Sequence, residues 1–238
     1  MELLPSRRTR YLLLFVSLLA MVGMIEALAK AVAGYGGLGF VVTLWACFGA
    51  AYAWLLIEPM IRPLLLMRRA VHDSSERRVR QIGADVASDA GTMNPKFYVY
   101  DSETFDVMVS GIGKGATILV SGAAADLDDR RLRSILAQEF GHIRLRHSLI
   151  RLTMYGSLLS LAIIGQRVTA VVLPANMFVL WTMRQMEFAA DRDAARLVGS
   201  SDVRAALEHV GAVLGDIPDW QAAFSTLPTF RDRIARLS

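Results

Sequence analysis

Two long apolar runs open the chain and support the first structural prediction. Residues 11–33 are interrupted only by two charged residues near their far end, and residues 36–57 carry no charge. A helix needs about 20 apolar residues to cross a bilayer, so each run is long enough. The glycine-rich turn GYGG joins them. The pattern therefore predicts a transmembrane helical hairpin within residues 1–70.

Arginine is distributed unevenly around these two runs. Three arginines precede the first run, six lie between residues 62 and 80, and the turn between the runs has none. Arginine-rich flanks stay on the cytoplasmic side of a membrane. We therefore expect a multi-pass protein of a bacterial-type inner membrane, with both ends and the following domain in the cytoplasm. A cleavable signal peptide is the weaker interpretation, because a second apolar run follows directly.

A third apolar region covers residues 152–183, where Arg167 and Pro174 interrupt it. Each half is shorter than a straight span needs. Two interpretations remain, a tilted or partial membrane hairpin and a buried helical pair, and the scarcity of charge favours membrane contact. The sequence thus predicts a domain over residues 71–238 with a membrane-associated apolar insert at about 152–183.

The rest of this domain combines strand and helix patterns. Residues 97–100, 107–109 and 117–120 are rich in β-branched, aromatic and other apolar side chains and predict short strands. The segment GIGKG lacks the spacing of a phosphate-binding loop, G-x-x-x-x-G-K-[ST], and predicts a hairpin turn. Apolar residues then recur at helical spacing from Asp128, and a last helical part is expected from about Glu187 to Leu214. The predicted fold class is α+β, mainly helical with a small β-sheet.

Composition agrees with a membrane protein and excludes several alternatives. Hydrophobic residues make up 54% of the 238 residues, and the mean hydropathy is +0.39, which is too apolar for an ordinary soluble domain. Arginine at membrane edges accounts for the net charge of +4, and no interleaving of arginine with aromatic residues indicates nucleic-acid binding. The single cysteine, Cys47, excludes a disulfide framework and a zinc site built on thiolates.

The stretch SILAQEFGHI, residues 134–143, carries the candidate chemistry. With a histidine in place of Gln138 it would read H-E-F-G-H, in which two zinc ligands at i and i+4 share one helix face. Here that pair is Gln138 and His142, and Glu139 lies where a general base would take a proton from zinc-bound water. Glu187 is the candidate third ligand from elsewhere in the chain. Asp191, four residues later on the same face, is expected to orient a ligand histidine.

Three segments in order carry a family resemblance: LVSGAAADLDDRRLRSILAQEFGHIRLRH, EFAADRDAARLVG and FSTLPTFRDRIARL. They resemble the H-E-x-G-H-x-x-x-x-H, E-x-x-A-D-x-x-A-x-x-x-G and S-T-H-P-x-x-x-x-R-I-x-x-L motifs of integral-membrane zinc metallopeptidases like HtpX and the prenyl-protein proteases, which are gluzincins. The resemblance implies a zincin-like domain with His142 and Glu187 as zinc ligands. It also implies Glu139 as the general base and Asp191 as a supporting carboxylate.

The chain departs from the family pattern in ways that weaken the expected zinc site. Gln138 replaces the first histidine ligand, and a neutral amide oxygen is a poorer zinc ligand than imidazole, so this ligand is weak or lost. Leu227 replaces the histidine of the S-T-H-P segment. A lesser departure is Asp106, with its two neighbours, where the family often has asparagine and alanine. His147 is on another helical face than His142 and could reach the metal only if the helix ended or kinked near it; the resemblance implies a histidine here that is near the site but is not a ligand.

Two functional hypotheses follow from these residues. The first is a membrane zinc endopeptidase of weak activity that hydrolyses membrane or unfolded proteins. The second is a catalytically inactive relative that binds or regulates protein partners at the bilayer, because two family histidines are missing together. Whether the protein is an enzyme and whether it holds zinc are left open by the sequence, as is its oligomeric state.

Overall fold

The computed structural model describes residues 62–63, 65–71, 74–111, 113–164, 169–218, 221 and 225–237, without the side chains of 114 and 156–174. The chain divides into two compact units, Met1–Ile57 and Glu58–Ser238. The predicted transmembrane hairpin lies outside the described residues. Within the part of the chain that the structure describes, no helix combines the length and the apolar character that a bilayer crossing requires.

A four-stranded sheet forms one layer of the second unit. Its strands are β1 (Ala70–Val71), β2 (Lys96–Tyr100), β3 (Val107–Ser110) and β4 (Thr117–Ser121), in the order β1-β2-β4-β3. The central strands β2 and β4 are parallel, with Val99 opposite Val120, while β1 and β3 pair antiparallel at the edges. The three predicted strands are confirmed, and so is the hairpin at GIGKG, because β3 and β4 pair antiparallel on either side of it.

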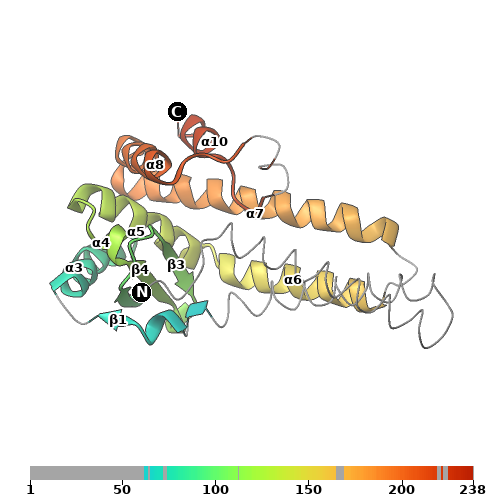
Figure 1. Ribbon diagram of the computed structural model, residues 1–238, viewed down its shortest axis with the longest axis horizontal. Helices are drawn as coiled ribbons and strands as arrows, with labels where there is room; N and C mark the ends of the chain where they lie inside the picture. Colours follow the sequence, from blue (N-terminus) through green and yellow to red (C-terminus); the bar gives the residue numbers. More distant parts are fainter. Residues whose placement is uncertain are drawn as a thin grey trace, which may run out of the picture. The chain divides into compact units, whose positions relative to one another are not determined.

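Helices make up most of the unit (Figure 1). In chain order they are α3 (Ser74–Asp89), α4 (Gly122–Ala125), α5 (Asp129–Arg144), α6 (His147–Ile164), α7 (Thr169–Val198), α8 (Ser200–Leu214) and α10 (Phe230–Ala235). The expected α+β class, mainly helical with a small sheet, is confirmed.

Helix α5 lies at the centre of the core. Its N-cap Asp128 accepts a hydrogen bond from the backbone N–H of Arg131 at 3.0 Å, which begins the helix where the sequence predicted it. Its apolar face is buried at Leu132, Leu136 and Phe140, and the ring of Phe140 packs 6.3 Å from that of Phe97 on β2. One face of α5 therefore covers the sheet, and its other sides contact α7 and α8 (Figure 1).

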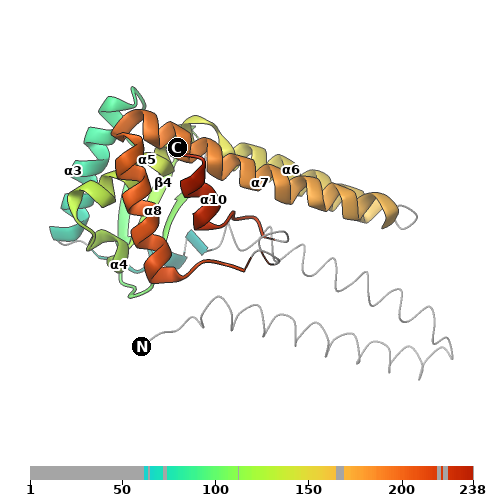
Figure 2. The ribbon, with the colours of Figure 1, turned by 90° about the horizontal axis from the view of Figure 1, so that it is seen from above.

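The region from 152 to 183 forms parts of two helices, α6 and α7, that run side by side (Figures 1 and 2). Helix α7 begins at Thr169, so the helix expected to start near Glu187 begins 18 residues earlier. It does not continue to Leu214, because Gly199, with φ of 95°, breaks it before α8. Leu152, Phe178 and Trp181 are exposed, and the last two side chains stack on each other. Val179 and Met183 on the same helix are buried, so the choice between membrane contact and a buried helical pair stays a prediction.

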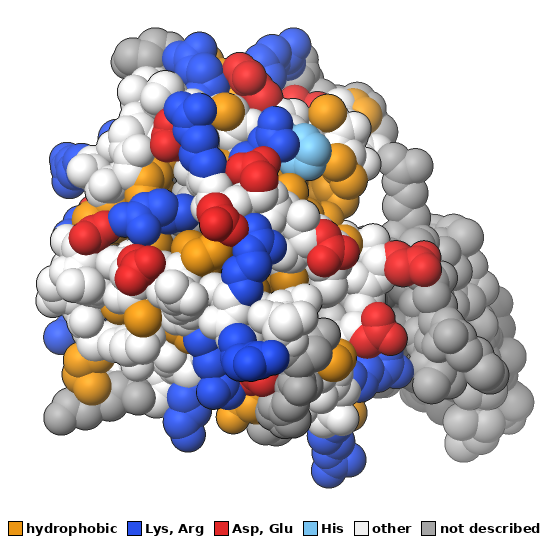
Figure 3. All heavy atoms as spheres, turned by 90° about the vertical axis from the view of Figure 1, so that its left-hand side faces the viewer, with side chains coloured by type: hydrophobic (Ala, Val, Ile, Leu, Met, Phe, Trp, Pro, Cys, Tyr) orange, Lys and Arg blue, Asp and Glu red, His pale blue; other side chains and the backbone are white. Residues whose placement is uncertain are grey.

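The surface at the other end of the unit has a different character. The face that includes α3, the start of α5 and α8 carries interleaved basic and acidic side chains (Figure 3). Among them are the ion pairs Arg130–Asp202 and Arg133–Asp89. Charged side chains of both signs indicate a face in contact with water, in contrast to the apolar side chains of α6 and α7.

Candidate active site

Helices α5 and α7 cross at very short range, and this crossing creates the candidate site. A Cβ atom added to Gly141 would lie 3.1 Å from both the Cα and the carbonyl oxygen of Ala190. Any larger side chain at position 141 would push the helices apart. The glycine in E-F-G-H thus allows the polar face of α5 to meet the face of α7 that carries Glu187.

Gln138 and His142, which the motif spacing places on one helix face, meet Glu187 at this crossing. The His142 Nε2 atom lies 3.6 Å from the Glu187 Oε2 atom. The side-chain amide of Gln138 donates to the same carboxylate oxygen at 3.4 Å. All three side chains are buried.

His147 lies closer to this group than a continuous helix would allow. Helix α5 ends at Arg144, Arg146 adopts a left-handed conformation with φ of 56°, and α6 begins at His147. The chain reversal places the His147 Nδ1 atom 2.8 Å from the His142 Nδ1 atom. His142 therefore faces Glu187 with one ring nitrogen and His147 with the other.

Charge interactions shift the pKa values of this buried group. Burial opposes ionisation of Glu187, but the charge and hydrogen bond of His142 lower its pKa to about 2. Burial likewise opposes protonation of His142, yet the Glu187 carboxylate raises the pKa of His142 above its usual value. Burial and the His142 charge lower the pKa of His147 to about 4. An imidazolium at His142 can donate to both neighbours, with His147 as a neutral acceptor.

Glu139 is partly exposed and lies within electrostatic reach of His142 and Glu187. Loss of solvent raises its pKa to about 7 in spite of the nearby His142, and the Glu187 carboxylate adds to the rise. A carboxyl group that titrates near neutral pH can both accept and release a proton under physiological conditions.

Asp191 lies one turn after Glu187 but does not contact a histidine. Its carboxylate is bound at both oxygens by Arg233 of α10, with distances of 2.8 and 2.6 Å, and both side chains are buried. Arg233 was not singled out from the sequence. The sequence feature that could have pointed to it is its match to the arginine of the third motif. It lies 42 residues from the carboxylate that it binds. Leu227 is exposed in the segment before α10 and offers no polar group.

Comparison with known proteins agrees with this geometry. Residues 73–238 match Peptidase family M48. The chain belongs to this family. Among relatives, a Protease HtpX homolog of Janthinobacterium sp. (strain Marseille) is 24% identical over 79% of this chain and 81% of its own length. A Protease HtpX homolog of Leptothrix cholodnii is 26% identical over 84% of both chains.

A solved structure supports the M48 fold. The crystal structure of S. mikatae Ste24p matches with a TM-score of 0.53 and 15% identity, over 94% of this chain. The chain spans 66% of the length of that protein. At 15% identity, this match shows a shared fold and nothing beyond the fold.

The M48 site of this chain does not fit a resident catalytic zinc ion. Such zinc takes three protein donors and a water, and the three ligand positions of the motif offer two strong donors, His142 and Glu187, while the His147 ring nitrogen nearest the group faces His142. Gln138 points its NH₂ group at Glu187, so its amide would have to turn before the oxygen could face a cation. Across the described ranges, no group of three or more His, Cys, Asp or Glu side chains is arranged to hold a metal.

Proposed function

We propose that this chain is a membrane-bound M48 protein that has kept the peptidase fold and lost efficient zinc-dependent hydrolysis. It acts by binding or regulating polypeptides at the membrane. The observation that carries the proposal is Gln138, whose amide N–H donates to Glu187 in the place of the first histidine ligand. This hydrogen bond joins Gln138 directly to Glu187, two positions that a bound zinc ion would otherwise bridge.

Two further observations support a site that is stable without metal. The ion pair of His142 with Glu187 compensates two buried charges that would otherwise be costly in the absence of a cation. Leu227 removes the second family histidine from the segment before α10. The replacements at Gln138 and Leu227 each remove a histidine of the family pattern, and they leave the surrounding fold intact.

The proposed location is a bacterial-type inner membrane, with the peptidase domain in the cytoplasm. The arginine asymmetry around residues 11–57 supports this orientation. The exposed Phe178 and Trp181 support lipid contact by the insert at about 152–183. In this arrangement residues 1–70 anchor the domain of residues 71–238, and its partners are membrane or unfolded proteins.

A zinc endopeptidase of weak activity is the second candidate. It is favoured by Glu139, whose pKa of about 7 suits a general base. The 3.6 Å between His142 and Glu187 is also compatible with two ligands of one ion. In this alternative, Gln138 would supply the third donor after its amide had turned.

The test is the zinc content of the purified full-length chain, combined with casein cleavage in the presence and absence of a chelator. We expect zinc far below one atom per chain and no chelator-sensitive cleavage. Stoichiometric zinc together with chelator-sensitive cleavage would reject the main proposal and support the endopeptidase.

The variant Gln138→His sharpens this test because it returns the missing donor. We expect it to bind zinc, and we expect Gln138→His combined with Glu187→Gln to lose that zinc again. The double variant is the matched control, since it keeps the new histidine and removes one strong ligand. If Gln138→His binds no zinc, the site has lost more than the first histidine.

A further inference from the structure

The turn between α5 and α6 has no local sequence feature that favours it. Helix α5 ends at Arg144, although no glycine or proline occurs between residues 142 and 147. Arg146 adopts the left-handed conformation, with φ of 56°, which a side chain with a Cβ atom disfavours. Among the described residues, no other non-glycine residue has a positive φ. A contact with another part of the fold is therefore needed to hold the chain in this turn.

Arg144, the last residue of α5, forms an ion pair with Asp193 of α7. Its Nη2 atom contacts the Asp193 Oδ1 atom, and the side chains of Arg144 and Asp193 are 39% and 3% exposed. The second carboxylate oxygen of Asp193, Oδ2, is buried and has no hydrogen-bond partner in the part of the chain that the structure describes. Arg144 is therefore the cation that compensates this buried charge. Without it, the carboxylate would need a new partner or a proton.

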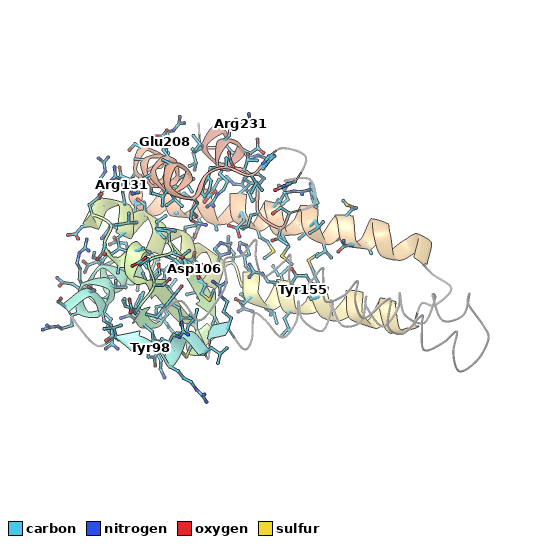
Figure 4. All side chains as sticks on the ribbon, in the orientation of Figure 1. Tyr98, Asp106, Arg131, Tyr155, Glu208 and Arg231 are labelled. Carbon is cyan, nitrogen blue, oxygen red and sulfur yellow. The ribbon has the colours of Figure 1, made fainter. Side chains whose placement is uncertain are left out.

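This ion pair fixes the chain between the two histidines of the candidate site. Arg144 follows His142 by two residues and precedes His147 by three. With the turn in place, the two Nδ1 atoms lie 2.8 Å apart and the rings meet edge to face, with centroids 4.8 Å apart. In a continuous helix the two side chains would project about 140° apart and could not meet. Both α5 and α6 contact α7, the helix of Asp193 (Figure 4, where Tyr155 marks α6).

We propose that Asp193 is a positioning residue, which ends α5 through its ion pair with Arg144 and so places His147 against His142. The contact with His147 in turn fixes the orientation of the His142 ring, whose Nε2 atom faces Glu187. Asp193 thus acts on the site through the turn at the end of α5. This role is the same whether the site hydrolyses polypeptides or only binds them.

The test is the nitrogen–nitrogen coupling across the histidine contact, measured by NMR on the full-length chain with ring-¹⁵N-labelled histidine in detergent. The wild-type chain should show this coupling between His142 and His147, and its absence would overturn the proposal. In the double variant Arg144→Met with Asp193→Leu, no buried charge is left unpaired, so we expect a folded domain without the coupling. Arg144→Lys keeps the cation and should keep the coupling.

The matched control removes another ion pair of α5, at the opposite end of the helix. Arg130→Met with Asp202→Leu should leave the coupling unchanged. Loss of the coupling in this control would overturn the proposal, because any weakening of α5 would then have the same effect. Coupling retained in Arg144→Met with Asp193→Leu, or failure of that variant to fold in circular dichroism, would assign the pair to stability alone and would equally overturn it.

A glycine at position 146 tests the route by which Asp193 acts. Glycine adopts the left-handed conformation without steric cost, so it favours the turn in the absence of the ion pair. Added to Arg144→Met with Asp193→Leu, the substitution Arg146→Gly should restore the coupling between the two histidines. If the coupling stays absent in this triple variant, Asp193 does not act through the turn and the proposal is wrong.

Discussion

At the scale of single residues, the candidate site depends on one residue that has no side chain, Gly141. Gly141 lets α5 and α7 approach so closely that His142 and Glu187 lie 3.6 Å apart. The glycine has no positive φ, so its role is space and not backbone conformation. Its position between Glu139 and His142 therefore couples the stability of the helix crossing to the geometry of the site.

We expect Gly141→Ala to lower the free energy of unfolding by about 1–3 kcal/mol, because the new methyl group meets backbone atoms of Ala190 that cannot move aside easily. The measurement is urea unfolding in detergent, followed by circular dichroism. Gly115→Ala is the control, since an added Cβ there meets nothing within 4 Å. Equal stability of the two variants would contradict a tight crossing.

At the scale of secondary-structure elements, α10 is a short helix that depends on side-chain contacts with α7 for its stability. It has six residues, too few to be stable alone. Thr229 caps it by accepting from the Asp232 N–H at 3.0 Å. Arg233 binds Asp191, and Arg236 lies 3.8 Å over the ring of Phe188. These contacts fix the C-terminal helix beside the turn of α7 that carries Glu187.

Breaking the buried pair is expected to be costly. Asp191→Asn or Arg233→Met should each lower the free energy of unfolding by about 3–5 kcal/mol, because either change leaves the remaining charge buried without its partner. Chemical denaturation of the full-length chain measures this. Arg130→Gln, which disrupts an exposed pair with Asp202, should change stability little. If Arg130→Gln lowered the free energy of unfolding as much as Asp191→Asn does, the buried pair would not be more important for stability than the exposed one.

The elements set by local periodicity were predictable from the sequence, whereas those set by distant partners were not. The β3–β4 hairpin and the apolar face of α5 follow from residue patterns within a few positions, and so does the joint placement of Gln138 and His142. The position of His147 depended on a helix end at Arg144, and no proline or glycine marks that end. The partner of Asp191 depended on packing across 42 residues, which periodicity cannot reveal.

At the scale of the whole molecule, the described unit has two chemically different surfaces. Interleaved charges cover the face of α3, α5 and α8 (Figure 3), while large apolar side chains are exposed on α6 and α7. Exposed aromatic residues on a helix pair are typical of the boundary between lipid and water. The contrast supports the proposed contact of the insert with the bilayer.

Spin labels on two equally exposed residues test this contact. With Cys47→Ser as background, a label at Phe178→Cys should be accessible to oxygen and protected from a water-soluble nickel complex in vesicles. A label at Val213→Cys should show the opposite, because Val213 lies on α8. Phe178 and Val213 are 58% and 60% exposed, so exposure alone predicts no difference. The same nickel accessibility at both positions would argue against lipid contact.

The unbroken course of α7 has a mechanical consequence. The helix that presents Trp181 also carries Glu187, six residues and about 9 Å further along its axis. Helices respond to a change of bilayer thickness by tilting. When a rigid helix tilts, both of its ends move. In the proposed membrane arrangement, we therefore expect thinning of the bilayer to move the Glu187 carboxylate relative to His142.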